Sequence, residues 1–166
     1  MSKYDEDSSI YNGIIDDQEV IIDRPVAQVW ERFLDIGSWV TTHHIEELPG
    51  PRRELGAITR VTSIGAEEAG YLPAFYHYCK IIRLLPEHHC VLKTYSEKGG
   101  SYGMQITAFD DTRFFAIDGK TKVTFRLYGE FRGEIVAKNP AVMNLEGSRE
   151  GMIKNLQNLK RIVESR

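Results

Sequence analysis

Cysteine is scarce in this sequence, with only Cys79 and Cys90 among its 166 residues. The two flank residues 85–88, which are typical of a turn, so pairing of the flanking strands places Cys79 opposite Thr94. That position lies roughly 13 Å along the ladder from Cys90. Because a disulfide needs Cα atoms within about 7 Å, the spacing predicts two free thiols.

The sequence also lacks a strong charge of one sign and a long apolar run. It has 21 basic and 24 acidic residues, with a formal net charge of −3. The basic residues are scattered among acids rather than gathered in a stripe with aromatics, which argues against a nucleic-acid partner. No apolar segment is long enough to cross a bilayer, and the acidic N-terminus does not lead into an apolar signal segment. We therefore expect a cytoplasmic protein without a membrane span.

What is present fits one domain with a substantial core. Hydrophobic residues make up 42% of the chain and aromatic residues 10%, and no internal repeat is apparent. Residues 1–11 are polar and follow neither the helical nor the strand period, so they are predicted to form a flexible leader. Residues 12–166 are predicted to form a single domain.

Alternation of apolar and polar residues predicts most of this domain to be strands. The predicted strands are 14–23, 45–48, 57–64, 75–84, 89–97, 104–117 and 121–132. Asp118-Gly119 is a strong signal for a tight hairpin between the last two. In the last strand Val123, Phe125 and Leu127 alternate with polar residues, as in an antiparallel sheet that is buried on one face.

Helical spacing of apolar residues appears in three places. Pro25 is predicted to open a short amphipathic helix, because its fixed φ suits a first helical turn. Residues 38–44 are predicted to form a second short helix. Asn139-Pro140 would open a long amphipathic helix that continues to Val163. The resulting element order, β-αα-ββββββ-α, predicts an α+β fold.

This order leaves one long helix to cover the apolar face of a broad sheet. A single helix is too narrow for so many strands. If the sheet curls around the helix, space remains between them that side chains or a ligand must fill. The sequence therefore predicts an internal cavity.

Four segments together resemble the helix-grip (SRPBCC) superfamily, which includes START domains, the major birch-pollen allergen type and bacterial polyketide cyclase/dehydrase proteins. They are VIIDRPVAQVWERFLD at 20–35, GAITRV at 56–61, DGKTKVTF at 118–125 and LQNLKRIVE at 156–164. The resemblance extends from about residue 14 to residue 164. It implies a helix-grip fold, with a curved antiparallel sheet of about seven strands around a long C-terminal helix.

The resemblance also implies a hydrophobic cavity between the sheet and the helix, although members of the superfamily differ in function. Our leading hypothesis is that the chain binds a small hydrophobic molecule, such as a lipid, a polyketide or an aromatic compound. One alternative is a cyclase, dehydratase or isomerase that uses general acid and base groups without a metal or other cofactor. Another is a cochaperone-like interaction module. The oligomeric state is left open.

The predicted cavity residues are large apolar or aromatic side chains. They are Trp39, Tyr71, Tyr76, Tyr78, Phe125, Leu127, Met143, Met152 and Leu156, with Val20 and Ile22 in the same apolar walls. Trp39 and Tyr71 are included because the resemblance places them in cavity-gating segments. For each of these large apolar side chains, ordinary core packing is the competing interpretation.

The strand at 75–84 carries the candidates for catalysis, which are Tyr76, His77, Tyr78 and Arg83. Alternation puts His77, Cys79 and Arg83 on one face and Tyr76 and Tyr78 on the other, without deciding which face is buried. An inward Tyr or His would orient a ligand or transfer a proton. The alternative is an aromatic core whose polar tips are satisfied.

Two further patterns have a plain structural explanation. His43-His44 and His88-His89 invite a metal interpretation, with His77 as a fifth candidate. Neighbouring strand residues point to opposite faces, so at most one of His88 and His89 could face a shared site, and no metal-binding spacing accompanies these histidines. We therefore predict no metal site. The small residues Gly147 and Gly151 on the last helix favour close packing against the sheet over an approach of ligand to the backbone.

Overall fold

The structure of the chain is a computed structural model that describes residues 3–4, 10–63, 76–96, 105–133 and 145–165. The strands are β1 (Lys3–Tyr4), β2 (Ile10–Ile22), β3 (His43–Glu47), β4 (Ile58–Ser63), β5 (Tyr76–Leu85), β6 (His89–Tyr95), β7 (Gln105–Ile117) and β8 (Lys120–Arg132). The helical elements are α1 (Val26–Leu34), the 3-10 turn η1 (Ile36–Ser38) and α3 (Leu145–Glu164).

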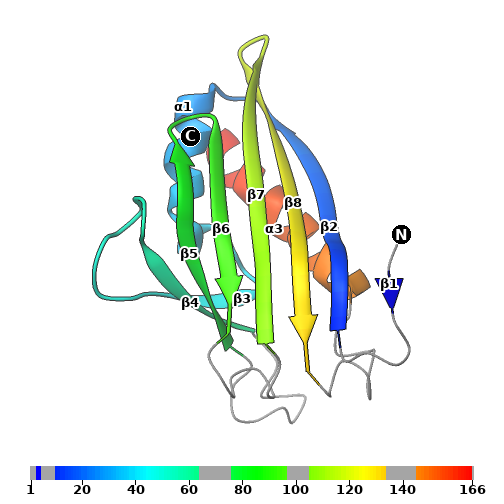
Figure 1. Cartoon of the computed structure of the whole chain (residues 1–166). Coiled ribbons are helices and arrows are strands. Elements are labelled where there is room, and N and C mark those ends of the chain that lie inside the picture. Colours follow the sequence, from blue (N-terminus) through cyan, green and yellow to red (C-terminus); the bar gives the residue numbers. More distant parts are fainter. Residues whose placement is uncertain (1–2, 5–9, 64–75, 97–104, 134–144, 166) are drawn as a thin grey trace.

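The described strands form one antiparallel sheet in the order β1-β2-β8-β7-β6-β5-β4-β3 (Figure 1). The sheet curves, and α3 crosses behind it while α1 covers one end. This confirms the predicted helix-grip fold, with the two-residue β1 added to the expected strands. We call the face toward α3 the inner face and the opposite face the outer face.

The hairpin and the thiols follow the predictions. Asp118 and Gly119 have φ of 49° and 77°, the two positive values that a tight type I′ hairpin requires. Cys79 pairs with Thr94 in the β5–β6 ladder, so it does not lie opposite Cys90. Both cysteines are free and buried.

The N-terminal boundary differs from the expectation. Ile10 and Tyr11, placed in the leader by sequence, begin β2 and pair with Arg132 and Phe131 of β8. Lys3–Tyr4 forms β1, which pairs with β2. The pairing partners of this segment are far away in sequence, so its polar composition alone did not reveal a strand.

Helix α1 begins one residue later than predicted, because Pro25 stands at its N-cap with φ −59° and ψ 151°. The second predicted helix, at 38–44, is wrong. The chain instead forms η1, and β3 begins at His43. After η1 the backbone is held by α3, because the Thr41 N–H donates to the Asn155 Oδ1 at 2.9 Å. A side chain far along the sequence thus replaces the helical hydrogen bond.

The core lies between α3, α1 and the sheet at the end of the molecule where α1 sits. Leu156, Leu159 and Val163 of α3 are buried together with Val123 and Phe125 of β8. The predicted start of the long helix at Asn139-Pro140 lies outside the described residues. Within them, no helix is long and apolar enough to cross a membrane.

Candidate functional site

The inner face of β5 carries His77, Cys79 and Ile81. Cys79 and Ile81 are buried, whereas Lys80 between them is exposed, and this resolves the question that alternation left open. A β-bulge between Ile81 and Arg83 then offsets the alternation by one residue. Arg83 is therefore exposed on the outer face, although simple alternation placed it with His77.

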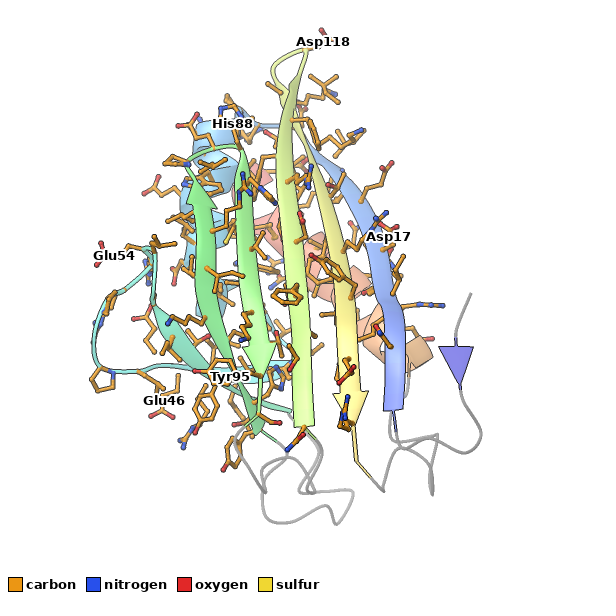
Figure 2. All side chains as sticks on the ribbon, in the orientation of Figure 1. Asp17, Glu46, Glu54, His88, Tyr95 and Asp118 are labelled. Atoms are coloured by element: carbon orange, nitrogen blue, oxygen red, sulfur yellow. The ribbon has the colours of Figure 1, made fainter. Side chains whose placement is uncertain are left out.

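Tyr76 and Tyr78 lie on the outer face. Tyr78 stacks on Tyr95 with ring centroids 5.5 Å apart, and Tyr76 meets Tyr78 edge to face at 5.9 Å. Figure 2 looks onto this face, with Tyr95 at the end of β6 and α3 behind the sheet. Of the four catalytic candidates, only His77 therefore faces the interior.

The other predicted cavity residues that the structure describes belong to the packed core. Trp39, Phe125 and Leu156 are buried in it, and Leu127 and Met152 are partly buried against it. Trp39 stacks on Phe33 and donates its indole N–H to the Phe33 carbonyl at 3.1 Å. Tyr71 and Met143 lie outside the described residues. A ligand contact at any of these positions stays a prediction.

A cavity of about 300 Å³ lies between the η1 segment and the inner face of β3 to β6. Its apolar lining includes Leu34, Ile36, Ile45, Ala57, Ile81 and Leu92, and its polar lining includes Asp35, Glu47, Arg53, Thr59 and Cys79. Arg53 bonds both Asp35 (2.8 Å) and Glu47 (3.3 Å), so the charged groups pair with one another. None of the described cavity residues predicted from sequence lines this cavity.

A hydrogen-bonded chain leads away from the cavity along the inner face. The Thr94 hydroxyl donates to Asp110 Oδ1 at 3.2 Å, and Cys79 Sγ lies 3.5 Å from the same hydroxyl oxygen. Because the single hydroxyl hydrogen of Thr94 goes to Asp110, the thiol is the donor to Thr94. Cys79, which lines the cavity, is thereby linked to the carboxyl group of Asp110.

A second carboxyl group lies on the same face, on the far side of β8. Asp16 and Asp110 both pair with Leu127, one from β2 and one from β7. Asp16 is only 1% exposed. Its Oδ1 accepts a hydrogen bond from Gln18 Nε2 at 2.9 Å, but its Oδ2 has no partner within the described structure.

Burial changes the proton affinity of these groups. It raises the pKa of Asp110 to about 7, against the lowering effect of the Thr94 hydrogen bond, and Asp16 adds to the rise. Burial likewise raises the pKa of Asp16. The pKa of Cys79 is also raised well above its ordinary value, chiefly by burial. Because a thiolate is the reactive form, Cys79 is not a nucleophile here.

Two histidines form a second polar group on the inner face. The rings of His43 and His77 meet edge to face with centroids 6.2 Å apart. His43 Nδ1 lies 2.8 Å from the Thr42 hydroxyl, which accepts a hydrogen bond from Asn155 Nδ2 at 2.8 Å. Burial lowers the pKa of His77 to about 4, with a contribution from His43. Both rings are therefore neutral near pH 7, since burial lowers the pKa of His43 as well.

Helix α3 approaches this group closely. A Cβ at Gly151 would lie 3.4 Å from the Thr42 Cγ2, which supports the close-packing interpretation of that glycine. The side chain of His89 lies elsewhere and pairs with Asp111 at 2.9 Å. Within the described residues, no three metal-ligating side chains gather.

The sequence reasoning missed Asp16, Thr94 and Asp110. A signal was available, because Asp16-Asp17 and Asp110-Asp111 are acidic doublets inside alternating strands. Neighbouring strand residues point to opposite faces, so one member of each doublet had to face inward. Asp17 is the outward member of its pair and bonds Arg126 at 2.8 Å (Figure 2).

Comparison with known proteins supports the fold. No protein-family model and no curated protein matches the sequence. Solved structures do match, among them a conserved protein from Geobacillus kaustophilus (TM-score 0.68, 16% identity, covering 93% of this chain and 95% of that one).

The Zhui aromatase/cyclase from Streptomyces sp. R1128 matches with TM-score 0.65 and 13% identity, covering 89% of this chain and 92% of that one. Ara h 8.0201 matches with TM-score 0.63 and 15% identity, covering 90% and 97%. The chain has the helix-grip fold that these structures share.

Proposed function

We propose that this protein binds a small hydrophobic molecule whose apolar body occupies the cavity beside η1. The cavity itself carries the proposal: about 300 Å³ of space meets the inner face at Ile45, Ile81 and Leu92. This volume is at the lower end of the usual range for ligand pockets, which combine mostly apolar walls with a few polar groups. The helix-grip fold supports a binding function in general, although no described residue of α3 lines this cavity.

Apolar contact is sufficient to drive such binding. A ligand that buries about 250 Å² of apolar surface gains about 6 kcal/mol, which corresponds to a Kd of tens of micromolar before the costs of association are counted. A polar group at the end of the ligand would set its orientation and add specificity.

Filling the cavity tests this proposal. Thr59 lines the cavity from β4, so Thr59→Trp should abolish binding of a two-ring aromatic probe such as 2-methylnaphthalene. Thr107 is exposed on the outer face of β7, and Thr107→Trp provides the matched control. Binding is measured by native mass spectrometry and by the thermal shift with the probe. Equal binding by wild type and Thr59→Trp, or none by either, contradicts the proposal.

A second candidate function, proton-transfer catalysis, is favoured by one observation. Asp110 and His77 share the inner face, and their environments reverse the ordinary order of their pKa values, to about 7 and about 4. A carboxyl group with a pKa of about 7 keeps part of its protons near neutral pH and can act as a general acid, and a neutral imidazole can accept a proton as a general base. This corresponds to the cyclase, dehydratase or isomerase alternative, with His77 as the base.

Exchange of deuterium into an enolisable aromatic ketone, 2-tetralone, measures this activity by NMR. His77→Gln and Asp110→Asn should each slow catalysed exchange by about 100-fold or more while the ketone still binds. Tyr76→Phe, on the outer face, should leave the rate unchanged. If the wild-type protein does not accelerate exchange, the catalytic candidate fails and the binding function stands alone.

A further inference from the structure

Asp16 is an unusual residue for the interior of a sheet. It is 1% exposed, and its Oδ2 has no hydrogen-bond partner within the described residues. An acid with a purely structural role would satisfy both oxygens, because a buried acceptor left unpaired destabilises the fold. The carboxyl group is thus held ready for a donor that the described chain does not provide.

The groups around Asp16 account for its other oxygen only. Gln18 donates to the Asp16 Oδ1 at 2.9 Å. The positive charge of Arg149 on α3 favours the ionised form of Asp16, but the Arg149 Nε donates its hydrogen bond to the Ile15 carbonyl at 3.0 Å. No ion pair to Asp16 occurs among the described residues. A donor for Oδ2 must therefore come from elsewhere.

The register of the sheet connects Asp16 to the cavity. Leu92, which lines the cavity, pairs with Asp110, and Asp110 pairs with Leu127, which in turn pairs with Asp16. These residues share the inner face, and neighbouring strands lie about 4.8 Å apart. Counted across the sheet from the cavity, Asp110 on β7 therefore comes first and Asp16 on β2 next. We name these two carboxyl groups the acid pair.

We propose that the acid pair binds the polar end of the ligand, and that this end is a hydrogen-bond donor, either a hydroxyl or an ammonium group, rather than a carboxylate. This inference rests on the proposed function, since it assigns the ligand class of the same inner space. The Asp16 Oδ2, an acceptor without a donor among the described residues, favours a group that carries hydrogen, and the carboxyl groups in their ionised form repel a group that is itself an anion. A metal ion is a poor alternative, because no third ligand gathers with the pair among the described residues.

Probes that share one apolar body and differ in one group test the acid pair. They are 2-naphthalenemethanol, 2-naphthylmethylamine, 2-naphthoate and 2-methylnaphthalene, with the Kd of each measured by isothermal titration calorimetry. Wild-type protein should bind the alcohol and the amine at least about tenfold more tightly than the carboxylate. The hydrocarbon measures the contribution of the apolar body alone. Comparing the Kd of the amine with that of the alcohol distinguishes the two charge states of the acid pair. An ionised pair binds the amine more tightly, whereas a protonated pair binds both with similar Kd.

The doublets supply matched variants. Asp16→Asn and Asp110→Asn replace the inward acids with near-isosteric amides, whereas Asp17→Asn and Asp111→Asn alter their outward neighbours. Each inward substitution should reduce the preference for donor over carboxylate to less than about threefold and leave the hydrocarbon Kd unchanged. The outward substitutions should preserve the preference. Thermal melts verify that each variant is folded, and either inward variant alone suffices for the test.

The outcomes separate this inference from the function on which it depends. If 2-methylnaphthalene does not bind the wild type, the proposed function fails. If it binds but the carboxylate binds as tightly as the alcohol and the amine, the function stands and the acid-pair proposal is overturned. The same follows if the donor preference survives unchanged in both Asp16→Asn and Asp110→Asn.

Discussion

The two ends of the inner face of the sheet differ in chemistry, although the same strands run through both. At the α1 end, Phe114 packs edge to face against Phe33 and Trp30 with centroids 5.0 and 5.1 Å apart, and Leu159 is fully buried. Farther along the same strands, the inner face carries Asp16, Asp110 and other polar groups. The α1 end thus contains the apolar core, while the other carries buried polar groups that cost stability.

Helix α3 packs through two kinds of contact. Its C-terminal half buries Leu156, Leu159 and Val163. Asn155 in the same half is also buried and bonds Thr41 and Thr42, and Asn158 donates to the Trp39 carbonyl at 2.8 Å. The contrast that matters for stability is therefore between the apolar core and the buried acids of the sheet. It predicts that substitutions in the two change stability in opposite directions.

The largest loss of stability on substitution is expected at the packed end. Leu159→Ala removes a side chain that is 0% exposed and leaves a cavity, so the free energy of unfolding should fall by about 3 kcal/mol. Urea denaturation followed by circular dichroism measures the loss. Ile153→Ala, at an exposed position on the same helix, should cost less than about 0.5 kcal/mol. Similar losses in the two variants would contradict the placement of Leu159 in the core.

At the polar end, Asp110 should make stability depend on pH. Its folded pKa of about 7 exceeds the ordinary value of 3.8, so the folded state binds a proton between pH 4 and 7 that the unfolded state releases. The contribution of Asp110 to stability should therefore fall as pH rises through this window, by about 4 kcal/mol, and stay lower above it. Asp110→Asn should abolish this fall in urea titrations from pH 4 to 8. Because His77 contributes a slope of the opposite sign over part of this range, the test is the difference between the two proteins, and equal slopes in wild type and Asp110→Asn would contradict the assignment.

His77 should act in the opposite sense. Its folded pKa of about 4 lies below the ordinary 6.5, so the unfolded state binds the extra proton between these values. The contribution of His77 to stability should rise with pH from 4 to 6.5, by about 3 kcal/mol, because acid favours the unfolded chain. His77→Gln should remove this contribution, and the matched substitution His88→Gln, at an exposed turn position, should not. If the free energy of unfolding changes with pH equally in wild type and His77→Gln, the contribution of His77 is excluded.

The smallest expected change is a gain. Asp16→Asn relieves an unpaired buried carboxylate, so the free energy of unfolding at pH 7 should rise by about 1 kcal/mol. Asp17→Asn removes an exposed ion pair with Arg126, so its free energy of unfolding should fall by less than about 0.5 kcal/mol. Thermal and urea unfolding of both variants provide the comparison. A loss of stability in Asp16→Asn would show that the acid is structurally required.

The sequence predicted the parts of this molecule that depend on local patterns. Alternation and the Asp118-Gly119 signal located the strands and the last hairpin, and helical spacing located α1 and α3. The segment 38–44 failed because the hydrogen bond from Thr41 to Asn155 depends on tertiary packing. Arg83 was assigned to the wrong face because alternation does not reveal the bulge before it.

The candidate site was less predictable than the fold. His77 was named from sequence and faces the interior, and a cavity was predicted between the sheet and the long helix, but the residues that line the cavity beside η1 and the acid pair were not anticipated. Apolar and polar residues alternate in the strand that carries Asp110. Because cavity residues were chosen among large apolar side chains, its acidic residues were not considered. Pairing between β2, β8 and β7 is what brings Asp16 and Asp110 to either side of Leu127, and such pairing is not contained in the period of any one strand.

The double contact of Arg53 has a kinetic consequence. The guanidinium joins Asp35, just after α1, to Glu47 at the end of β3, and all three residues line the cavity. Added salt screens such exposed pairs over distances of about 8–10 Å. Rates of ligand entry and exit should therefore rise together with ionic strength, and the dissociation constant of an uncharged guest should change little.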